Sequence, residues 1–121
     1  MEAIVLVLVI GAAVMGGFAQ VLFKKGMIQL GEITISQAFK EIFKLFTNHF
    51  VFAGLLLYVV STIVYLTALS RGELSALYPL ISISYVVAGG LSVLLLGEKI
   101  SLTRWIGIIT IVIGVFLVVR G

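Results

Sequence analysis

The sequence predicts an all-α integral membrane protein in which four transmembrane helices form a single domain, residues 1–121. Of its 121 residues, 62% are hydrophobic and 11% are charged, and the mean hydropathy is +1.32. Soluble domains have about 45–50% apolar and about 25% charged residues. A chain of 13.0 kDa has too small an interior to bury this excess. The excess apolar surface is therefore expected to face the lipid bilayer.

Four stretches of the chain are long enough to cross the bilayer. They cover residues 4–23, 50–69, 74–96 and 102–119, and the only charge among them is Arg104. About 20 helical residues cross a hydrocarbon core of about 30 Å. Because these stretches lack the alternation of membrane β-strands, each is predicted to be a helix. The first is expected to be retained, since Glu2 stands where a signal peptide has basic residues.

The connector between the first two spans is predicted to contain an amphipathic helix at about 36–48. Ser36 is placed to cap this helix. Its apolar residues follow i, i+3, i+4, i+7 spacing and are Phe39, Ile42, Phe43 and Phe46. A phenylalanine face with lysines beside it suits the headgroup region. We expect an anchor in that region, and attraction of anionic lipid is the functional alternative.

Lysine and arginine are distributed unevenly between the two sides of the predicted membrane domain. Arg71 and Arg120 lie on one side, whereas six basic residues lie on the other: Lys24, Lys25, Lys40, Lys44, Lys99 and Arg104. Because cytoplasmic loops are enriched in lysine and arginine, both termini are predicted to lie outside. The net charge of +3 is explained by basic residues that flank the membrane spans, and no nucleic-acid partner is expected.

The titratable residues argue against several classes of protein. Cysteine and aspartate are absent, and His49 is the only histidine, so no metal site and no cofactor are expected. No nucleophile–base pair is recognisable, so no catalytic residues and no enzyme activity are expected. All five glutamates lie in connectors or at helix ends. A buried carboxylate that carries protons across the membrane is therefore disfavoured.

Polar side chains predicted to line a substrate path lie on the first three spans. The first carries Gln20, one face of the second carries Tyr58, Ser61, Thr62 and Tyr65, and the third carries a continuous stripe of Ser75, Tyr78, Ser82, Tyr85, Gly89 and Ser92. Close helix packing is the alternative explanation, because small residues and hydroxyls also join membrane helices. Inward-facing tyrosines favour a path, since membrane tyrosines are enriched at the interface.

Two further features concern motion and assembly. Pro79 and the pair Gly89 and Gly90 predict a bent third helix with a hinge, for which a harmless kink is the alternative. Gly107 and Gly114 lie seven residues apart in the fourth span and therefore on one face. Glycine permits close helix contact, so this face is a candidate dimer interface.

Three motifs carry a resemblance to a known family: GGFAQVLFKKGM, LSRGELSALYPLISISYVVAGGLSVLLLGEKIS and TRWIGIITIVIGVFLVV. With them, the sequence resembles the drug/metabolite transporter (EamA-like) superfamily in its single-repeat form of four helices. Within it, the sequence is most similar to the small subunits of the aminoarabinose-phosphoundecaprenol flippase, which share Gln20, Lys24 and the stretch 77–82. Small multidrug resistance exporters are less similar, because Gly16 and Ile81 replace their glutamate and tryptophan.

The resemblance implies a transporter of the prokaryotic inner membrane that acts as a homodimer or as a heterodimer with a similar four-helix subunit. The predicted function is translocation of a polyprenyl-phosphate-linked sugar, or a similar amphiphile, between leaflets. Lys24 and Lys25, expected to end the first helix, would hold the phosphate. The sugar would contact Tyr58, Tyr65, Tyr78, Ser82 and Tyr85. The alternatives are an exporter of small metabolites or drugs, driven by Glu73 or Glu98, and a non-transporting accessory subunit.

Overall fold

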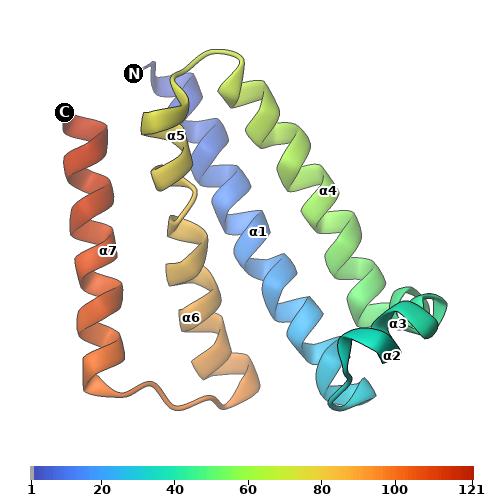
Figure 1. Ribbon diagram of the computed structural model, residues 1–121. Helices are drawn as coiled ribbons and strands as arrows, with labels where there is room; N and C mark the ends of the chain where they lie inside the picture. The colour runs from blue at the N-terminus through green and yellow to red at the C-terminus, as the bar shows by residue number, and fades with distance from the viewer. Residues whose placement is uncertain (1) are drawn as a thin grey trace.

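The computed structural model describes residues 2–121, and over these it is helical without a strand (Figure 1). The helices are α1 (Ala3–Leu30), α2 (Ile35–Lys40), α3 (Ile42–Thr47), α4 (His49–Leu69), α5 (Leu74–Leu80), α6 (Ile83–Leu96) and α7 (Leu102–Arg120). Helix α1, helix α4, the α5–α6 pair and helix α7 each have the length and hydropathy of a membrane span. The predicted architecture of four transmembrane helices is therefore confirmed.

Helix α1 is the central helix of the bundle. It packs along α4 on one side and against α6 on the other, while α7 lies at the outside (Figure 1). Near the end that holds both termini, Val5 and Val9 of α1 are buried with Leu77 of α5. Helix α7 buries only Ile108 and Val115 among its residues. Most of its surface is thus available to lipid or to another subunit.

Close approach between α1 and α6 depends on a residue without a side chain at Gly17. A Cβ atom there would lie 2.7 Å from the Cβ of Val87 and 3.0 Å from the carbonyl oxygen of Ser84. Carbon atoms in good contact are about 3.5–4.0 Å apart. Only glycine therefore lets the two helices pack at this distance.

A hydrogen bond joins α1 to α4 near mid-membrane. The Ser61 hydroxyl donates to the Ala12 carbonyl oxygen at 2.7 Å, and both residues are buried. We expect Ser61→Ala to lower the free energy of unfolding by about 0.6 kcal/mol, the average for bonds between membrane helices. Equilibrium unfolding in mixed micelles measures this change. Thr62→Val is the control, because the Thr62 hydroxyl bonds within its own helix, to Tyr58; equal effects would contradict the role of Ser61.

The prediction that Lys24 and Lys25 end the first helix is wrong, because α1 continues to Leu30. The charges mark the edge of the apolar stretch, but packing against α4 keeps the following residues helical. Asn48, which caps α4, donates from its side-chain amide to Gln29 at 3.0 Å. Helix α1 is about 42 Å long at about 1.5 Å per residue, so its last turns extend beyond the hydrocarbon core.

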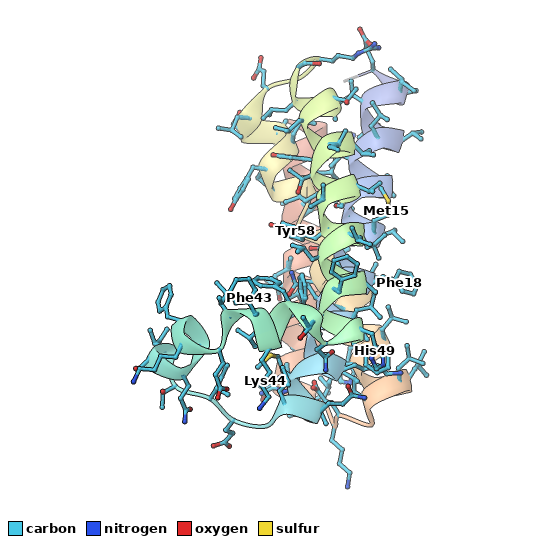
Figure 2. The ribbon with its side chains drawn as sticks, turned by 90° about the vertical axis from the view of Figure 1, so that its right-hand side faces the viewer. Met15, Phe18, Phe43, Lys44, His49 and Tyr58 are labelled. Atoms are coloured by element: carbon cyan, nitrogen blue, oxygen red, sulfur yellow. The ribbon has the colours of Figure 1, made fainter. Side chains whose placement is uncertain are left out.

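The predicted single helix at 36–48, capped by Ser36, is also incorrect. Thr34 is the cap instead, because its side chain and that of Gln37 bond each other's backbone amides in a capping box. The helix is interrupted at Glu41, giving α2 and α3. Both project sideways from the spans. In α3, Phe43 lies on the side that faces along the length of the spans, and Lys44 lies on the opposite side (Figure 2). This arrangement suits the membrane interface.

The third span is interrupted rather than merely bent. Pro79 has no amide proton to donate, and the following residues form tighter turns in which Ser82 N bonds Pro79 O at 3.0 Å and Tyr85 N bonds Ser82 O at 2.9 Å. The Ser82 hydroxyl also donates to the Pro79 carbonyl oxygen, at 2.5 Å. This interruption separates α5 from α6. The polar stripe predicted along the third span is consequently not continuous.

Candidate substrate site

The first hollow, here called the tyrosine cavity, lies among α1, α4, α5 and the beginning of α6. Its volume is about 320 Å³, and its lining residues are Ala12, Gly16, Gln20, Tyr58, Ser61, Thr62, Tyr65, Tyr78, Ile81 and Ser84. Tyr58 lies near the middle of α4, well away from either end of the bundle (Figure 2). Pockets for small ligands have about 300–1,000 Å³. The tyrosine cavity is therefore large enough for a sugar-sized group at mid-membrane depth.

One hydroxyl in the tyrosine cavity lacks a partner. The Oη atom of Tyr65 is buried and has no hydrogen bond within the described residues. Leaving a buried polar group unsatisfied costs about 1–3 kcal/mol, so native proteins seldom retain one without a reason. Tyr65 lines the tyrosine cavity, so this hydroxyl belongs to a residue beside the space that a ligand would occupy.

The second hollow, here called the basic pocket, lies among α1, α6, the α6–α7 loop and α7. Its volume is about 230 Å³, and its lining residues are Gln20, Val21, Lys24, Tyr85, Ala88, Gly89, Ser92, Leu96, Glu98, Ile100, Arg104 and Ile108. Two of these are cations, Lys24 and Arg104, and one is an anion, Glu98. All three side chains are exposed. The basic pocket therefore carries two cations and one anion that a ligand can reach from outside.

The sequence fixes the backbone that carries Glu98 and Arg104. Gly97 ends α6 in the left-handed region, with φ 69°, and the amides of Gly97 and Glu98 both bond to the Ser92 carbonyl oxygen. Three residues later, the Ser101 hydroxyl accepts from the Arg104 amide at 3.2 Å and caps α7. These two caps hold the short loop, so that both charges lie at the rim of the basic pocket.

The residues predicted to form one path are divided between the two hollows. Gln20 lines both of them. The tyrosine cavity takes Tyr58, Tyr65 and Tyr78, and the basic pocket takes Lys24, Tyr85 and Gly89. The tighter turns after Pro79 cause this division, because they shift the side chains of α6 around the helix axis relative to those of α5.

Other predicted residues lie outside the two hollows. The Nζ atom of Lys25 lies 5.5 Å from the centre of the Phe50 ring, and Ser82 bonds the backbone at Pro79. A Cβ atom at Gly90, Gly107 or Gly114 would meet nothing within 4 Å. The last two thus lie on a bare face of α7, toward lipid or another subunit.

Sequence reasoning missed Arg104 of the basic pocket and Ser84 of the tyrosine cavity, and it named Glu98 only as a residue that could drive export of a small solute. Arg104 resembles an ordinary interfacial charge in the sequence, and Glu98 lies outside the apolar spans. The signal that could have found them is the pair of helix caps around the five-residue connector 97–101. Within residues 2–121, no group of three potential metal ligands occurs.

Comparison with known proteins identifies the family. Residues 36–120 match the model of the EamA-like transporter family. The chain belongs to this family. The match covers α2 to α7, and the four apolar spans make this EamA-like protein a multi-pass membrane protein.

Three curated bacterial relatives have similar sequences, and all three bear the name "Probable 4-amino-4-deoxy-L-arabinose-phosphoundecaprenol flippase subunit ArnF". The Proteus mirabilis protein is 36% identical over 115 residues, which are 90% of this chain and 86% of that protein. The Erwinia tasmaniensis protein is 38% identical over 84 residues, covering 68% and 66%. The Photorhabdus laumondii protein is 34% identical over 108 residues, covering 84% and 86%. No solved structure matches the chain.

Proposed function

We propose that this EamA-like protein is a flippase subunit that moves a polyprenyl-phosphate-linked sugar between leaflets, as the names of its relatives suggest. The observation that carries the proposal is the arrangement of the two hollows. A cationic pocket at one end of the spans adjoins a polar cavity at mid-membrane depth, and Gln20 lines both. Such a pair of sites provides one place for a phosphate and another for a sugar.

The phosphate binds in the basic pocket under this proposal. Lys24 lies about 30 Å along α1 from Ala3 at about 1.5 Å per residue, which is the depth of the headgroups. Arg104 supplies a second cation within the first turn of α7. A helix N-terminus adds its partial positive charge to the attraction. Lys25, assigned to phosphate in the sequence, contributes only to the surrounding positive potential.

The sugar enters the tyrosine cavity during translocation. The hydroxyls of Tyr58, Tyr65 and Tyr78 offer hydrogen bonds that replace water in a region where unsatisfied polar groups are costly. A cavity of about 320 Å³ accommodates the headgroup and leaves the long polyprenyl chain in the bilayer. Ser82 faces the backbone at Pro79 instead and is not assigned to substrate.

The orientation follows from the charges. The α6–α7 loop, which contributes Glu98 and Ile100 to the basic pocket, lies at the same end of the spans as α2 and α3 (Figure 1). Six of the eight lysine and arginine residues belong to this side. We infer that this side is cytoplasmic and that both termini are outside. The headgroup would then be taken up at the cytoplasmic leaflet of the inner membrane.

Movement and assembly complete the proposal. The interruption between α5 and α6, after Pro79, acts as the hinge, aided by Gly89 and Gly90. The bare face of α7 with Gly107 and Gly114 receives a second four-helix subunit, identical or similar. Helices that pack loosely on their own subunit, as α7 does, are suited to this role.

Translocation is tested in cells that make the lipid-linked amino sugar. An amine-reactive reagent that cannot cross the membrane measures how much of this lipid lies in the outer leaflet. We expect the exposed fraction to rise several-fold when the chain is produced together with the second four-helix subunit of the proposal, and to fall again with Lys24→Ala. An unchanged exposed fraction would contradict transport and favour the accessory-subunit alternative.

Export of a small metabolite is the second candidate, and the position of Glu98 in the basic pocket favours it. In that case, uptake of a cationic solute into vesicles would depend steeply on the pH gradient and disappear with Glu98→Gln. Lipid translocation would be absent.

Removing the Tyr65 hydroxyl separates substrate recognition from stability. Because this hydroxyl makes no hydrogen bond within the described residues, we expect Tyr65→Phe to leave the free energy of unfolding unchanged or slightly raised. Loss of one hydrogen bond to the sugar weakens binding of the lipid-linked sugar by about two- to tenfold. Titration of the purified protein with this lipid, beside thermal unfolding, checks both effects. Unchanged binding would remove Tyr65 from the site.

A further inference from the structure

The carboxylate in the basic pocket has no role in binding a phosphate. Glu98 lines the same pocket as Lys24 and Arg104, where a negative charge opposes an anionic ligand. The backbone holds it there, since the Glu98 amide bonds the Ser92 carbonyl oxygen at 3.1 Å. A pocket with two cations and one anion is complementary to a ligand that carries both charges.

We propose that Glu98 binds a primary ammonium group on the headgroup while Lys24 and Arg104 bind its phosphate, so that the basic pocket selects zwitterionic amine–phosphate headgroups. This inference rests on the proposed function and adds the residue that distinguishes an amino sugar from a neutral one. It assigns Glu98 a role in specificity.

The size and position of the basic pocket support this assignment. Its volume of about 230 Å³ is below that of pockets for drug-sized ligands and suits a headgroup alone. Glu98 lies in the capped 97–101 loop and Arg104 in the first turn of α7, whereas Lys24 comes from α1. Opposite charges from separate elements thus line one space, into which a headgroup with separated charges fits at uptake, before its sugar moves to the tyrosine cavity.

The strength of charged hydrogen bonds explains why the basic pocket selects between headgroups with and without an amine. An ammonium–carboxylate bond is about twice as strong as a neutral one, and the apolar residues Leu96, Ile100 and Ile108 form part of the pocket wall beside the charges. A headgroup without an amine would leave Glu98 beside its phosphate with no compensating charge. Such unpaired charges are a general source of specificity.

The test measures binding of three lipids to the purified full chain by native mass spectrometry in detergent. The probes are a short-chain polyprenyl phosphate bearing a 4-amino sugar, the same lipid with its amine N-formylated, and phosphatidylethanolamine. We expect the amino lipid to bind about tenfold or more tightly than its formylated form. Glu98→Gln should reduce this preference to less than about threefold. Glu73→Gln, at the opposite end of the spans, should retain it.

The outcomes separate this inference from the proposed function. Equal binding of the amino and formylated lipids would overturn the role of Glu98 and leave the flippase proposal standing. Failure of both to bind would overturn the two together. Preferential binding of phosphatidylethanolamine would support amine–phosphate recognition but assign it to a bulk lipid, against the flippase proposal. The comparison of amino and formylated lipids needs only the wild-type chain, so a Glu98 variant that fails to fold does not prevent it.

Discussion

Lys24→Ala is expected to weaken binding of a polyprenyl-phosphate sugar by about ten- to a hundredfold, the loss of one charged hydrogen bond. Lys24 lines the basic pocket, which is the proposed phosphate site. Titration calorimetry of the purified protein in micelles, with a short-chain polyprenyl phosphate sugar, measures the change.

The neighbouring lysine provides a matched control. Lys25→Ala removes the same charge at the same depth, but Lys25 lies over the Phe50 ring and outside the basic pocket. We expect its affinity for the same lipid to stay within about threefold of wild type. If both variants lost affinity equally, general attraction by surface charge would explain the binding, and the basic pocket would not be a phosphate site.

Gly17→Ala is expected to have the largest effect on folding. The added methyl group would lie 2.7 Å from the Cβ of Val87, so α6 would have to move away from α1. Overpacking of this kind costs about 1–3 kcal/mol, and both hollows depend on the same contact between helices. Equilibrium unfolding in mixed micelles, together with the yield of monodisperse protein, measures the loss.

Gly11→Ala is the control for this substitution. Gly11 lies in the same helix, and a Cβ atom there would meet nothing within 4 Å. We expect the stability of this variant to equal that of wild type or exceed it, because alanine favours a helix over glycine. Similar losses in both variants would show that helix propensity, and not the α1–α6 contact, governs the effect.

The spans were predictable because their signal is local. Charge-free stretches of about 20 residues imply membrane helices through length and solvation alone. The ends of helices were less predictable, because α1 extends beyond its last charges through contacts with α4. The capping box at Thr34 is also local, and the pattern of threonine followed three residues later by glutamine could have located the beginning of α2.

The site was predictable only in part. Tyr58, Ser61, Thr62 and Tyr65 share a helix face by spacing, and they line one cavity. On the third span, helical spacing did not predict which residues share a hollow. The tighter turns at Ser82 shift every later side chain around the helix axis, away from the positions expected for one continuous α-helix. The approach of Glu98 and Arg104 to Lys24 joins residues about 75–80 positions apart in the chain. No periodicity within one helix contains that information.

Binding of a lipid-linked phosphate sugar by the chain is tested most directly by mass spectrometry of the lipids retained after gentle purification. We expect a stoichiometric polyprenyl-phosphate species carrying a sugar, on a complex whose mass corresponds to two four-helix subunits. The species should disappear with Lys24→Ala and persist with Lys25→Ala. Retention of bulk phospholipid alone, on protein purified from cells that make the lipid-linked sugar, would contradict binding of that sugar by the chain.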